Sequence, residues 1–381
     1  MQIQLEKTLD VEVVEGHLAE LWKRIAGGDS EDDVAVLRAR VANLLVFVAN
    51  AELLDEVRQM MLDLTAIHPC RVLMMHGARE EPDQDIEMSV ESYCQTDKRT
   101  GAKRLCCEEI TLKAQGSFVS ELPSAALPLL ISDLATFLWW RDVAQTGDKV
   151  FLNLVRAADR LVIDSAEFED TRRDLLEINK LFAKADSMRV GISDLNWARL
   201  TFWRGLLADF YDVPAYRDWL DNIDRVLIDY VGPERAPETV APQALLIAGW
   251  LAGRLEWKLA GRSQAKDDSE TTSFTYRSKK NQEIKLELRR VERRERKPGR
   301  LVQVELRSVG NTPVSFIVAR SADNLHLLSE SRLGSDTHRG RVLPVRNRTA
   351  AQLLSREMEI LCNDQIYQEA VAMAAMMITA K

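Results

Sequence analysis

The segment DRLVIDSAEF, residues 159–168, indicates the fold class of this protein. Arg160 to Ile163 is a short apolar run typical of a buried strand, and it leads through Asp164 and Ser165 into a helix expected to begin near Glu169. The segment before it has the same form, since residues 127–131 predict a strand that leads into a helix from Ser132 or Asp133. Strands that alternate with helices indicate an α/β domain whose sheet is covered by helices.

Upstream of this unit the sequence predicts helices first and strands afterwards. Apolar residues at helical spacing predict an amphipathic helix over residues 33–50, with Asp29 and Ser30 as caps. A second helix over residues 51–67 must end near His68, because the residue before a proline is disfavoured in the α conformation. The following segments predict strands at 70–75, 88–95 and 105–113, and the turn-like residues 96–101 make the last two a hairpin.

Downstream, two long segments predict helices that cover the sheet. They span residues 193–210, with Ser193 as the N-cap, and residues 241–259. Residues 261–272 are polar and predict a linker. Beyond them, alternating apolar residues over 284–288, 302–306 and 314–319 predict an antiparallel β-meander, and residues 350–380 predict a closing helix.

We therefore expect a mixed α/β (α+β) fold with a helical N-terminus, a mixed sheet covered by helices, an antiparallel β-meander and a C-terminal helix. The expected domains are N-terminal helices at 1–67, an α/β domain at 68–262, and the β-meander plus C-terminal helix at 273–381.

Composition excludes several classes of protein. With 46% hydrophobic and 29% charged residues among 381, the chain is neither disordered nor collagen-like. A net charge of -8 argues against nucleic acid as a partner. The start lacks the features of a secretory signal, and no apolar run reaches the roughly 20 residues that span a bilayer. We expect a cytoplasmic protein with no membrane partner.

Motifs for catalysis or cofactor binding are missing from the sequence. It contains no GxGxxG, no GxxxxGK[ST], no HExxH and no GxSxG. Asp133 and Asp164 follow predicted strands, where capping of the next helix competes with a ligand role. We predict no catalytic residue, no metal and no cofactor. The alternative is a stand-alone α/β enzyme that acts on a nucleotide or sugar ligand at Asp133 or Asp164.

Candidate contacts for a protein partner come from aromatic and basic residues. The chain has eight tryptophans, and Trp139 and Trp140, adjacent on a predicted helix, would point about 100° apart, so that one ring could face outward. Trp197 and Trp203 are further candidate anchors, with core packing as the alternative. Residues 276–310 carry twelve Lys or Arg against five Glu, and Arg293, Arg294 and Arg296 lie at the tip of the proposed hairpin. These arginines are candidates for contact with an acidic partner, with a solvated loop as the alternative.

Four stretches in order resemble the glucose-6-phosphate dehydrogenase assembly protein (OpcA) family: HPCRVL at 68–73, LPLLISDLATFLWW at 127–140, DRLVIDSAEF at 159–168 and DLNWARLTFWRGLLADFYD at 194–212. The resemblance implies a non-catalytic protein that binds glucose-6-phosphate dehydrogenase, favours its active oligomer and raises its activity. It would thereby support NADPH production in cells resembling cyanobacteria or actinobacteria.

The resemblance also implies a possible partner in thioredoxin, which would need a reactive cysteine. The chain has five cysteines, without a CxxC pair or a zinc-type spacing. Cys362 stands alone in the C-terminal part, and Cys106 and Cys107, adjacent on a predicted strand, face opposite ways. These three are the weak redox candidates, because cysteine reactivity depends on pKa and exposure.

Overall fold

The computed structural model describes residues 3–5, 11–26, 37–38, 41–65, 67–96, 103–233, 239–264, 270–292, 297, 299–309, 313–345, 348–360 and 362–380. The chain forms two compact units. The first unit comprises Met1–Ile163, Ala183–Ser193 and Arg348–Asn363, and the second comprises Asp164–Phe182, Asp194–Asn347 and Asp364–Lys381. The fold is mixed α/β, as the sequence predicts, and each unit is built on its own sheet.

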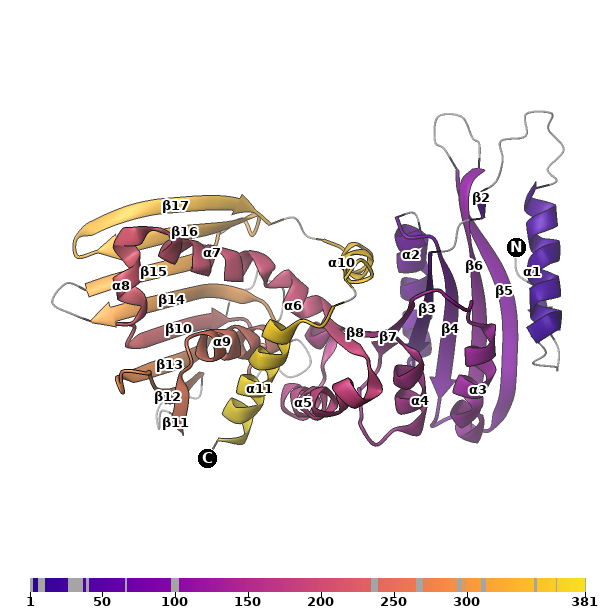
Figure 1. Cartoon of the computed structure of the whole chain (residues 1–381), viewed down its shortest axis with the longest axis horizontal. Coiled ribbons are helices and arrows are strands. Elements are labelled where there is room, and N and C mark those ends of the chain that lie inside the picture. The colour runs from indigo at the N-terminus through magenta and orange to yellow at the C-terminus, as the bar shows by residue number, and fades with distance from the viewer. Residues whose placement is uncertain are drawn as a thin grey trace. The chain divides into compact units, whose positions relative to one another are not determined.

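The first sheet has the strand order β1-β5-β6-β4-β3-β7-β8-β9, with β2 paired to β6 (Figure 1). Its strands are β1 Ile3–Leu5, β2 Leu37–Arg38, β3 Ala42–Val48, β4 Cys70–Ala78, β5 Gln84–Thr96, β6 Lys103–Gln115, β7 Thr136–Arg141, β8 Arg160–Ile163 and β9 Gly191–Asp194. β3 runs parallel to both β4 and β7, whereas β5 and β6 form the antiparallel hairpin that the sequence predicts. The sheet is therefore mixed.

The predicted helix over residues 33–50 is wrong. Residues 42–48 form β3, all seven of them buried, between β4 and β7 in the middle of the sheet. A strand buried on both faces needs a continuous apolar run, and such a run also satisfies the spacing of an apolar helix face. The proposed caps Asp29 and Ser30 lie outside the described residues.

The strand-to-helix unit predicted to begin at residue 127 is displaced along the chain. Leu127–Leu129 is a 3₁₀ turn (η3), and no helix follows it; residues 136–141 form β7 instead. β7 pairs with β3 in the register Leu45↔Leu138, so Trp139 and Trp140 lie on a buried strand rather than on a helix. The consecutive aromatic residues fit a strand with two covered faces, whereas Pro128 is the second residue of a short turn.

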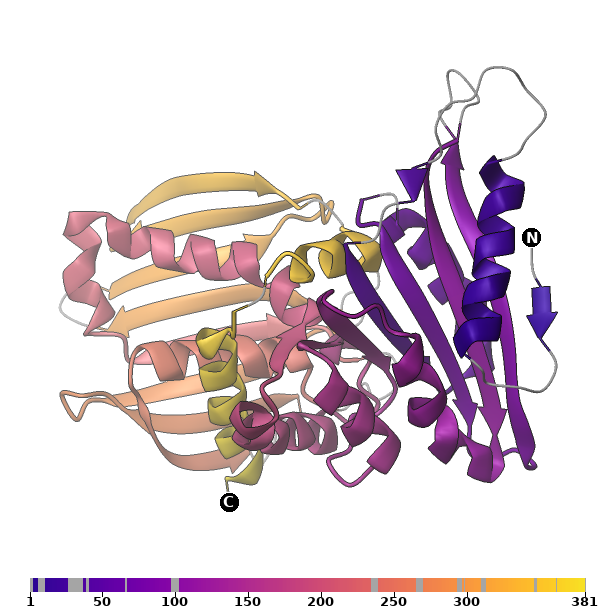
Figure 2. The ribbon, with the colours of Figure 1, turned by 45° about the vertical axis from the view of Figure 1, so that its right-hand side comes forward.

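Helices cover this sheet within the first unit. They are α1 Val11–Ala26, α2 Leu54–Thr65 after the 3₁₀ turn η1 Ala51–Leu53, α3 Leu122–Ala126 after η2 Gly116–Glu121, α4 Lys149–Ala157 and α10 Ala350–Glu357. α1 lies against β5 (Figure 2), and α10 packs on α2. The predicted helix over 51–67 is confirmed by η1 and α2.

The second unit holds an eight-stranded sheet in the order β11-β12-β13-β10-β14-β15-β16-β17. Its strands are β10 Arg225–Tyr230, β11 Lys258–Gln264, β12 Thr271–Arg277, β13 Glu283–Arg290, β14 Leu301–Val309, β15 Pro313–Arg320, β16 His326–Leu333 and β17 Asp336–Pro344. Its helices are α6 Leu195–Arg199, α7 Thr201–Asp212, α8 Pro214–Leu220, α9 Pro242–Arg254 and α11 Gln365–Thr379, with the 3₁₀ turn η4 Ser165–Glu167. α5 Thr171–Met188 has residues in both units.

Three predictions for this region need correction. β10 lies between β13 and β14, parallel to the first and antiparallel to the second, so these two strands are not hairpin partners. Residues 261–264 and 271–272, predicted as a linker, belong to β11 and β12. The helix predicted to begin at Ser193 is capped by Asp194, whose carboxylate accepts from the Asn196 amide. A short carboxylate at the end of a strand satisfies the exposed amides of the next helix.

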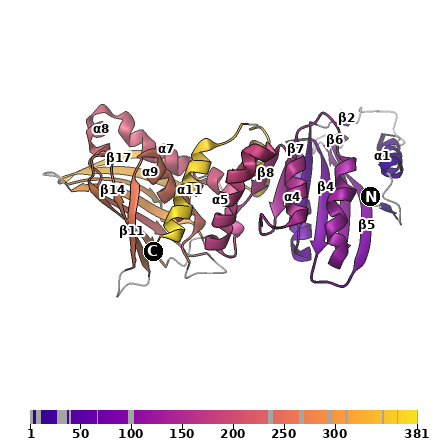
Figure 3. The same ribbon diagram turned by 60° about the horizontal axis from the view of Figure 1, so that its bottom comes forward.

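The helices of the second unit lie over one face of its sheet. α7 contacts β15 and β16, and α9 contacts β10 (Figures 1 and 3). Phe316 of β15 points to this side, with the rings of Phe210, Tyr211 and Tyr216 between 5.1 and 5.3 Å from its centroid. No helix in the described part of the chain is long and apolar enough to cross a bilayer.

Candidate functional site

The carboxyl ends of β3 and β7 are the first place to look for a ligand. Parallel α/β sheets bind ligands where the strand order reverses, and here β4 lies on one side of β3 while β7 lies on the other. A cavity of about 520 Å³ opens at this edge, lined among others by Asn50, His76, Arg79 and Asp142. A nucleotide-binding sheet would place its phosphate loop between β3 and α2.

This edge is unsuited to an anion. Asn50 caps η1, since its side chain accepts a hydrogen bond from the Glu52 amide at 2.9 Å. The cavity lining carries Glu80, Glu81 and Asp142 against Arg79, which already pairs with Asp148 at 2.5 Å. Because phosphate binding needs open amides and positive charge, the chemistry of this edge disfavours a nucleotide.

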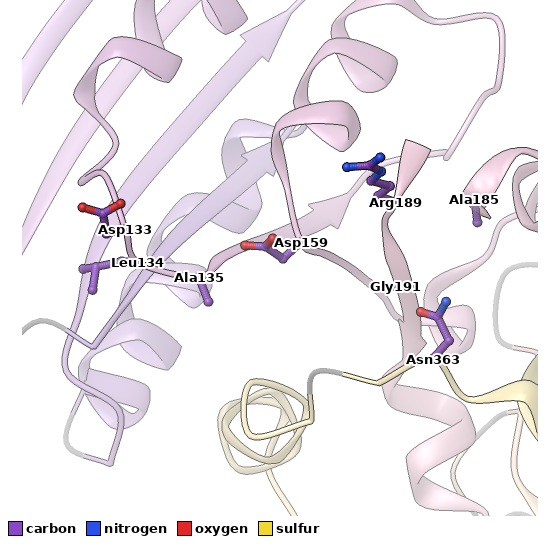
Figure 4. A pocket seen from close by; sticks show the side chains of 8 residues that line it. All are labelled: Asp133, Leu134, Ala135, Asp159, Ala185, Arg189, Gly191 and Asn363. Carbon is purple, nitrogen blue, oxygen red and sulfur yellow. The ribbon is translucent and has the colours of Figure 1, made fainter. Parts of the chain in front are cut away.

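A second cavity, of about 690 Å³, lies at the opposite edge of the same sheet. Figure 4 shows its lining side chains, among them Asp133, Asp159, Arg189 and Asn363. Asp159 and Gly191 stand at the starts of β8 and β9, so this cavity lies at the amino ends of those strands. α/β sheets bind their ligands at the other edge.

Asp133 does not have the position that the sequence predicts. It sits in the turn before β7 with φ 66°, a left-handed conformation that aspartate tolerates better than most residues. It therefore neither caps a helix nor follows a strand. The sequence gives no sign of this turn, because the residues 132–134 read equally well as a helix start.

The residues after β8 and β9 form a buried polar cluster in the second unit. Asp164 caps the 3₁₀ turn η4 by accepting from the Ala166 amide at 3.1 Å, whereas the sequence suggests either a cap of the next helix or a ligand role. Its carboxylate also receives two hydrogen bonds from Arg199, at 2.6 and 2.8 Å. Burial alone would lower the pKa of Arg199, but the charge and hydrogen bonds of Asp164, together with the charges of Asp194 and Glu167, raise that pKa above its usual value.

Asp194 lies at the centre of this cluster and is 1% exposed. It accepts from the amides of Ser165 and Asn196 at 2.9 and 2.8 Å, and from the Tyr367 hydroxyl at 3.2 Å. Burial, reinforced by the nearby charge of Asp164, raises the pKa of Asp194 to about 6. The carboxylate is enclosed by its own chain, so a substrate has no access to it.

Further hydrogen bonds extend the cluster toward α9 and α11. Gln243 donates to the Asn196 side chain at 2.7 Å and accepts from the Leu301 amide at 3.1 Å. The Trp197 indole donates to Asp364 at 2.8 Å. A network of buried groups that satisfy one another fixes one arrangement of the elements. The cluster therefore holds the second unit together. Sequence reasoning missed Asp194 and Arg199 as its members, because they meet Asp164 only in the folded chain.

The four candidate tryptophans are all core residues. Trp139, Trp140, Trp197 and Trp203 are between 1% and 4% exposed. Trp140 stacks on Phe47 with ring centroids 4.1 Å apart, and Arg204 lies over the Trp197 ring at 3.6 Å. Core packing, the alternative reading of these residues, describes their positions.

The basic and cysteine candidates, unlike the tryptophans, are not all buried, and several lie outside the described residues. Arg293, Arg294 and Arg296 lie outside the described residues, as does the side chain of Cys106. Cys107 is 3% exposed, and its burial raises its pKa, which disfavours the reactive thiolate. Cys362 is exposed. Among the residues that the structure describes, no group of three or more His, Cys, Asp or Glu is placed to hold a metal ion.

Two family models match this chain in sequence order. The model described as the glucose-6-phosphate dehydrogenase subunit N-terminal domain matches residues 62–180, and the corresponding C-terminal domain model matches residues 190–371. Both carry the OpcA family name. Between them they match most of the chain.

Curated relatives bear the same family name. An OxPP cycle protein OpcA from Nostoc punctiforme is 33% identical over 221 residues, which are 58% of this chain and 45% of the relative. Its counterpart from Synechocystis is 27% identical over 312 residues, 81% of this chain and 63% of the relative. The chain thus spans about half to two thirds of the length of these relatives.

Solved structures resemble the chain more distantly. The 3-ketoreductase KijD10 from Actinomadura kijaniata has a TM-score of 0.49 at 12% identity, over 88% of this chain and 95% of that one. A levoglucosan dehydrogenase has a TM-score of 0.46 at 10% identity, over 88% and 96%. The sequence identities and the TM-scores are both too low to bear on function.

Proposed function

Because this chain belongs to the OpcA family of glucose-6-phosphate dehydrogenase subunits, we propose that it binds glucose-6-phosphate dehydrogenase without being a catalyst itself. It favours the active oligomer of that enzyme and so supports NADPH production in the oxidative pentose phosphate pathway. The observation that carries the proposal is the ordered match of both domain models over residues 62–180 and 190–371.

The geometry of the first sheet supports a non-catalytic role. At the edge where an α/β enzyme would hold a nucleotide, the Asn50 side chain already accepts a hydrogen bond from the Glu52 amide in the first turn, and the cavity lining is acidic. The turn after β3 reads Ala49-Asn50-Ala51, without the glycines that let a backbone approach a phosphate. The residues present suit a folded scaffold better than a phosphate site.

Activation requires unequal binding to two states of the dehydrogenase. A partner that binds both states equally shifts nothing. Raising an active fraction from one tenth to one half needs about ninefold tighter binding to the active state, or roughly 1.3 kcal/mol. Such a difference is well within the range of a single protein interface.

An assay of NADPH formation tests the proposal. The purified chain alone should form no NADPH from glucose 6-phosphate and NADP, whereas increasing amounts added to the dehydrogenase of the same organism should raise its rate to a plateau. Co-elution of the two proteins provides an independent readout. If the chain neither changes the rate nor co-elutes, the proposal fails.

The competing function is a stand-alone enzyme acting on a nucleotide or sugar ligand. One observation favours it, namely the raised pKa of Asp194 beside Asp164, because perturbed carboxylates gather at active sites. A ligand of this kind should raise the midpoint of thermal unfolding in a saturable way, and Asp133→Ala or Asp164→Ala should abolish turnover. The enclosure of Asp194 by Ser165, Asn196 and Tyr367 makes this the weaker proposal.

Control of this chain by thioredoxin would depend on a reactive cysteine. Among the three cysteines whose side chains the structure describes, Cys362 is exposed to such a partner, while Cys70 and Cys107 are buried. If thioredoxin controls this chain, Cys362→Ser should remove the effect of oxidation on activation, and Cys107→Ser should leave it unchanged.

A further inference from the structure

The eight-stranded sheet of the second unit has a face opposite to its helices that carries a regular pattern of charge. We call it the open face. Successive side chains along a strand point to opposite faces of the sheet. Val226 and Ile228 of β10 are buried on the helix side, so the residues on either side of them point to the open face. Arg225, Arg307 and Arg332 have side chains 41%, 39% and 55% exposed, so the open face reaches solvent.

Two rows of residues cross the open face perpendicular to the strands. The register of the sheet aligns the cationic row, which consists of Lys285, Arg225, Arg307 and Arg332, with Ser315 between the last two. Two residues farther along each strand lies the acidic row, which consists of Glu287, Glu305 and Glu330, with Leu227 and Ile317 between them. The rows are therefore about 7 Å apart, since a strand rises about 3.3 Å per residue.

Neighbouring rows pair within the chain. Arg225 and Lys285 contact Glu287 at 2.8 and 2.6 Å, Arg307 contacts Glu305 at 2.7 Å, and Arg332 contacts Glu330 at 2.7 Å. These pairs tie each of the four cations to a carboxylate of its own chain, and Glu287 and Glu305 are only 6% and 4% exposed. The open face thus carries charges of both signs in rows that the register and the ion pairs fix.

We propose that the open face binds the open face of a second copy of this chain. The two-fold axis that relates the copies lies in the interface, parallel to the two rows and midway between them. Rotation about such an axis places the cationic row of one copy over the acidic row of the other. The arrangement pairs Arg332 with Glu330 across the interface, and Arg307 with Glu305. Each contact occurs twice, as in any interface between identical surfaces.

The size of the open face suits a stable dimer. Eight strands at about 4.8 Å spacing give a width of about 38 Å, and strands of about seven residues give a length of about 23 Å. The resulting area of roughly 900 Å² compares with about 800 Å² per partner in a typical stable interface. Leu328 and Val342, paired across β16 and β17 and 38% and 59% exposed, add apolar area on the same side.

Complementary charge reversals test this proposal. Glu330→Arg makes the β16 part of both rows positive, and Arg332→Glu makes it negative. Each variant alone should self-associate at least about tenfold more weakly than the original chain, because like charges then face each other twice. A mixture of the two variants should recover the association, since every contact then joins opposite charges. Lys180→Glu on α5, with a side chain 61% exposed, is the matched control.

Sedimentation equilibrium of the full chain, with a mass of 43.2 kDa for one copy, measures each case. The proposal expects a dimer for the original chain and for the Lys180→Glu control, and mixed dimers for the paired variants. A monomer at all concentrations up to about 100 μM, or a dimer that neither reversal weakens, would overturn it. A loss of binding to the dehydrogenase, with self-association unchanged, would assign the open face to that enzyme and also overturn the proposal. This outcome is independent of the proposed function, which is measured by activation.

Discussion

Asp164 and Arg199 form a two-pronged ion pair, with Oδ1 to Nη1 at 2.6 Å and Oδ2 to Nη2 at 2.8 Å, although 35 positions separate them in sequence. The Asp164 side chain is 5% exposed and that of Arg199 is 15% exposed. The pair joins η4 to α6 beside the buried cluster around Asp194. Removing one partner would leave the other charge buried without compensation.

Arg199→Ala should therefore lower the free energy of unfolding by about 3–5 kcal/mol, as measured by urea denaturation. Arg199→Lys should cost less, because it keeps the charge but cannot make both hydrogen bonds. Lys180→Ala removes an exposed pair with Glu177 and should stay within about 0.5 kcal/mol. Equal effects of Arg199→Ala and Lys180→Ala would show that the buried pair adds no stability.

The pKa of Asp194 predicts a dependence of stability on pH. Since the folded state raises this pKa to about 6, it binds the proton more tightly than the unfolded state, whose value is about 3.9. The contribution of the neutral carboxyl is fully present below about pH 4 and is lost as the pH rises through about 6. Asp194→Asn removes the titration and retains an acceptor for the amides of Ser165 and Asn196.

The stability of Asp194→Asn relative to the original chain should rise by up to about 3 kcal/mol between pH 4 and pH 7. Thermal or urea unfolding of both proteins at several pH values gives this difference directly. A difference that stays constant over the range would mean that Asp194 is not protonated in the folded chain.

Gly249 of α9 packs closely against α11. A Cβ atom placed there would lie well inside van der Waals contact distance of the Ala370 carbonyl oxygen. Gly249→Ala should destabilise the second unit by about 1–3 kcal/mol, since the two helices would have to separate. Gly205→Ala on α7, where a Cβ meets nothing within 4 Å, should stabilise by up to about 1 kcal/mol. We expect the midpoint of thermal unfolding to fall for Gly249→Ala and to rise for Gly205→Ala, and an unchanged midpoint for Gly249→Ala would contradict the close packing of α9 on α11.

Much of the fold could be predicted from local signals. Pro69 marks the end of the helix before β4, and alternating residues mark the strands from β13 to β15. The helix predicted over 33–50 failed because β3 is buried on both faces and its run Leu44 to Val48 is apolar throughout. Periodicity cannot distinguish such a strand from a buried helix.

The long-range features could not be predicted. Nothing in the sequence near β10 shows that it enters the later sheet between β13 and β14. Asp164 shows its capping role, but its pairing with Arg199 depends on packing of η4 against α6. Trp139 and Trp140 were predicted to lie on a helix, where one ring could face outward. They lie on β7, which is buried on both faces, so the error in secondary structure also led to the wrong expectation about their exposure.

Activation of glucose-6-phosphate dehydrogenase by this chain is tested most directly by calorimetry, which measures the affinity between the two proteins with and without glucose 6-phosphate. If the chain favours the active state, and that state binds substrate more tightly, each ligand must strengthen the binding of the other by the same factor. We predict that the chain binds the dehydrogenase more tightly when substrate is present, by the same factor with which the chain tightens substrate binding. No binding, or the same affinity with and without substrate despite activation at subsaturating substrate, would contradict it.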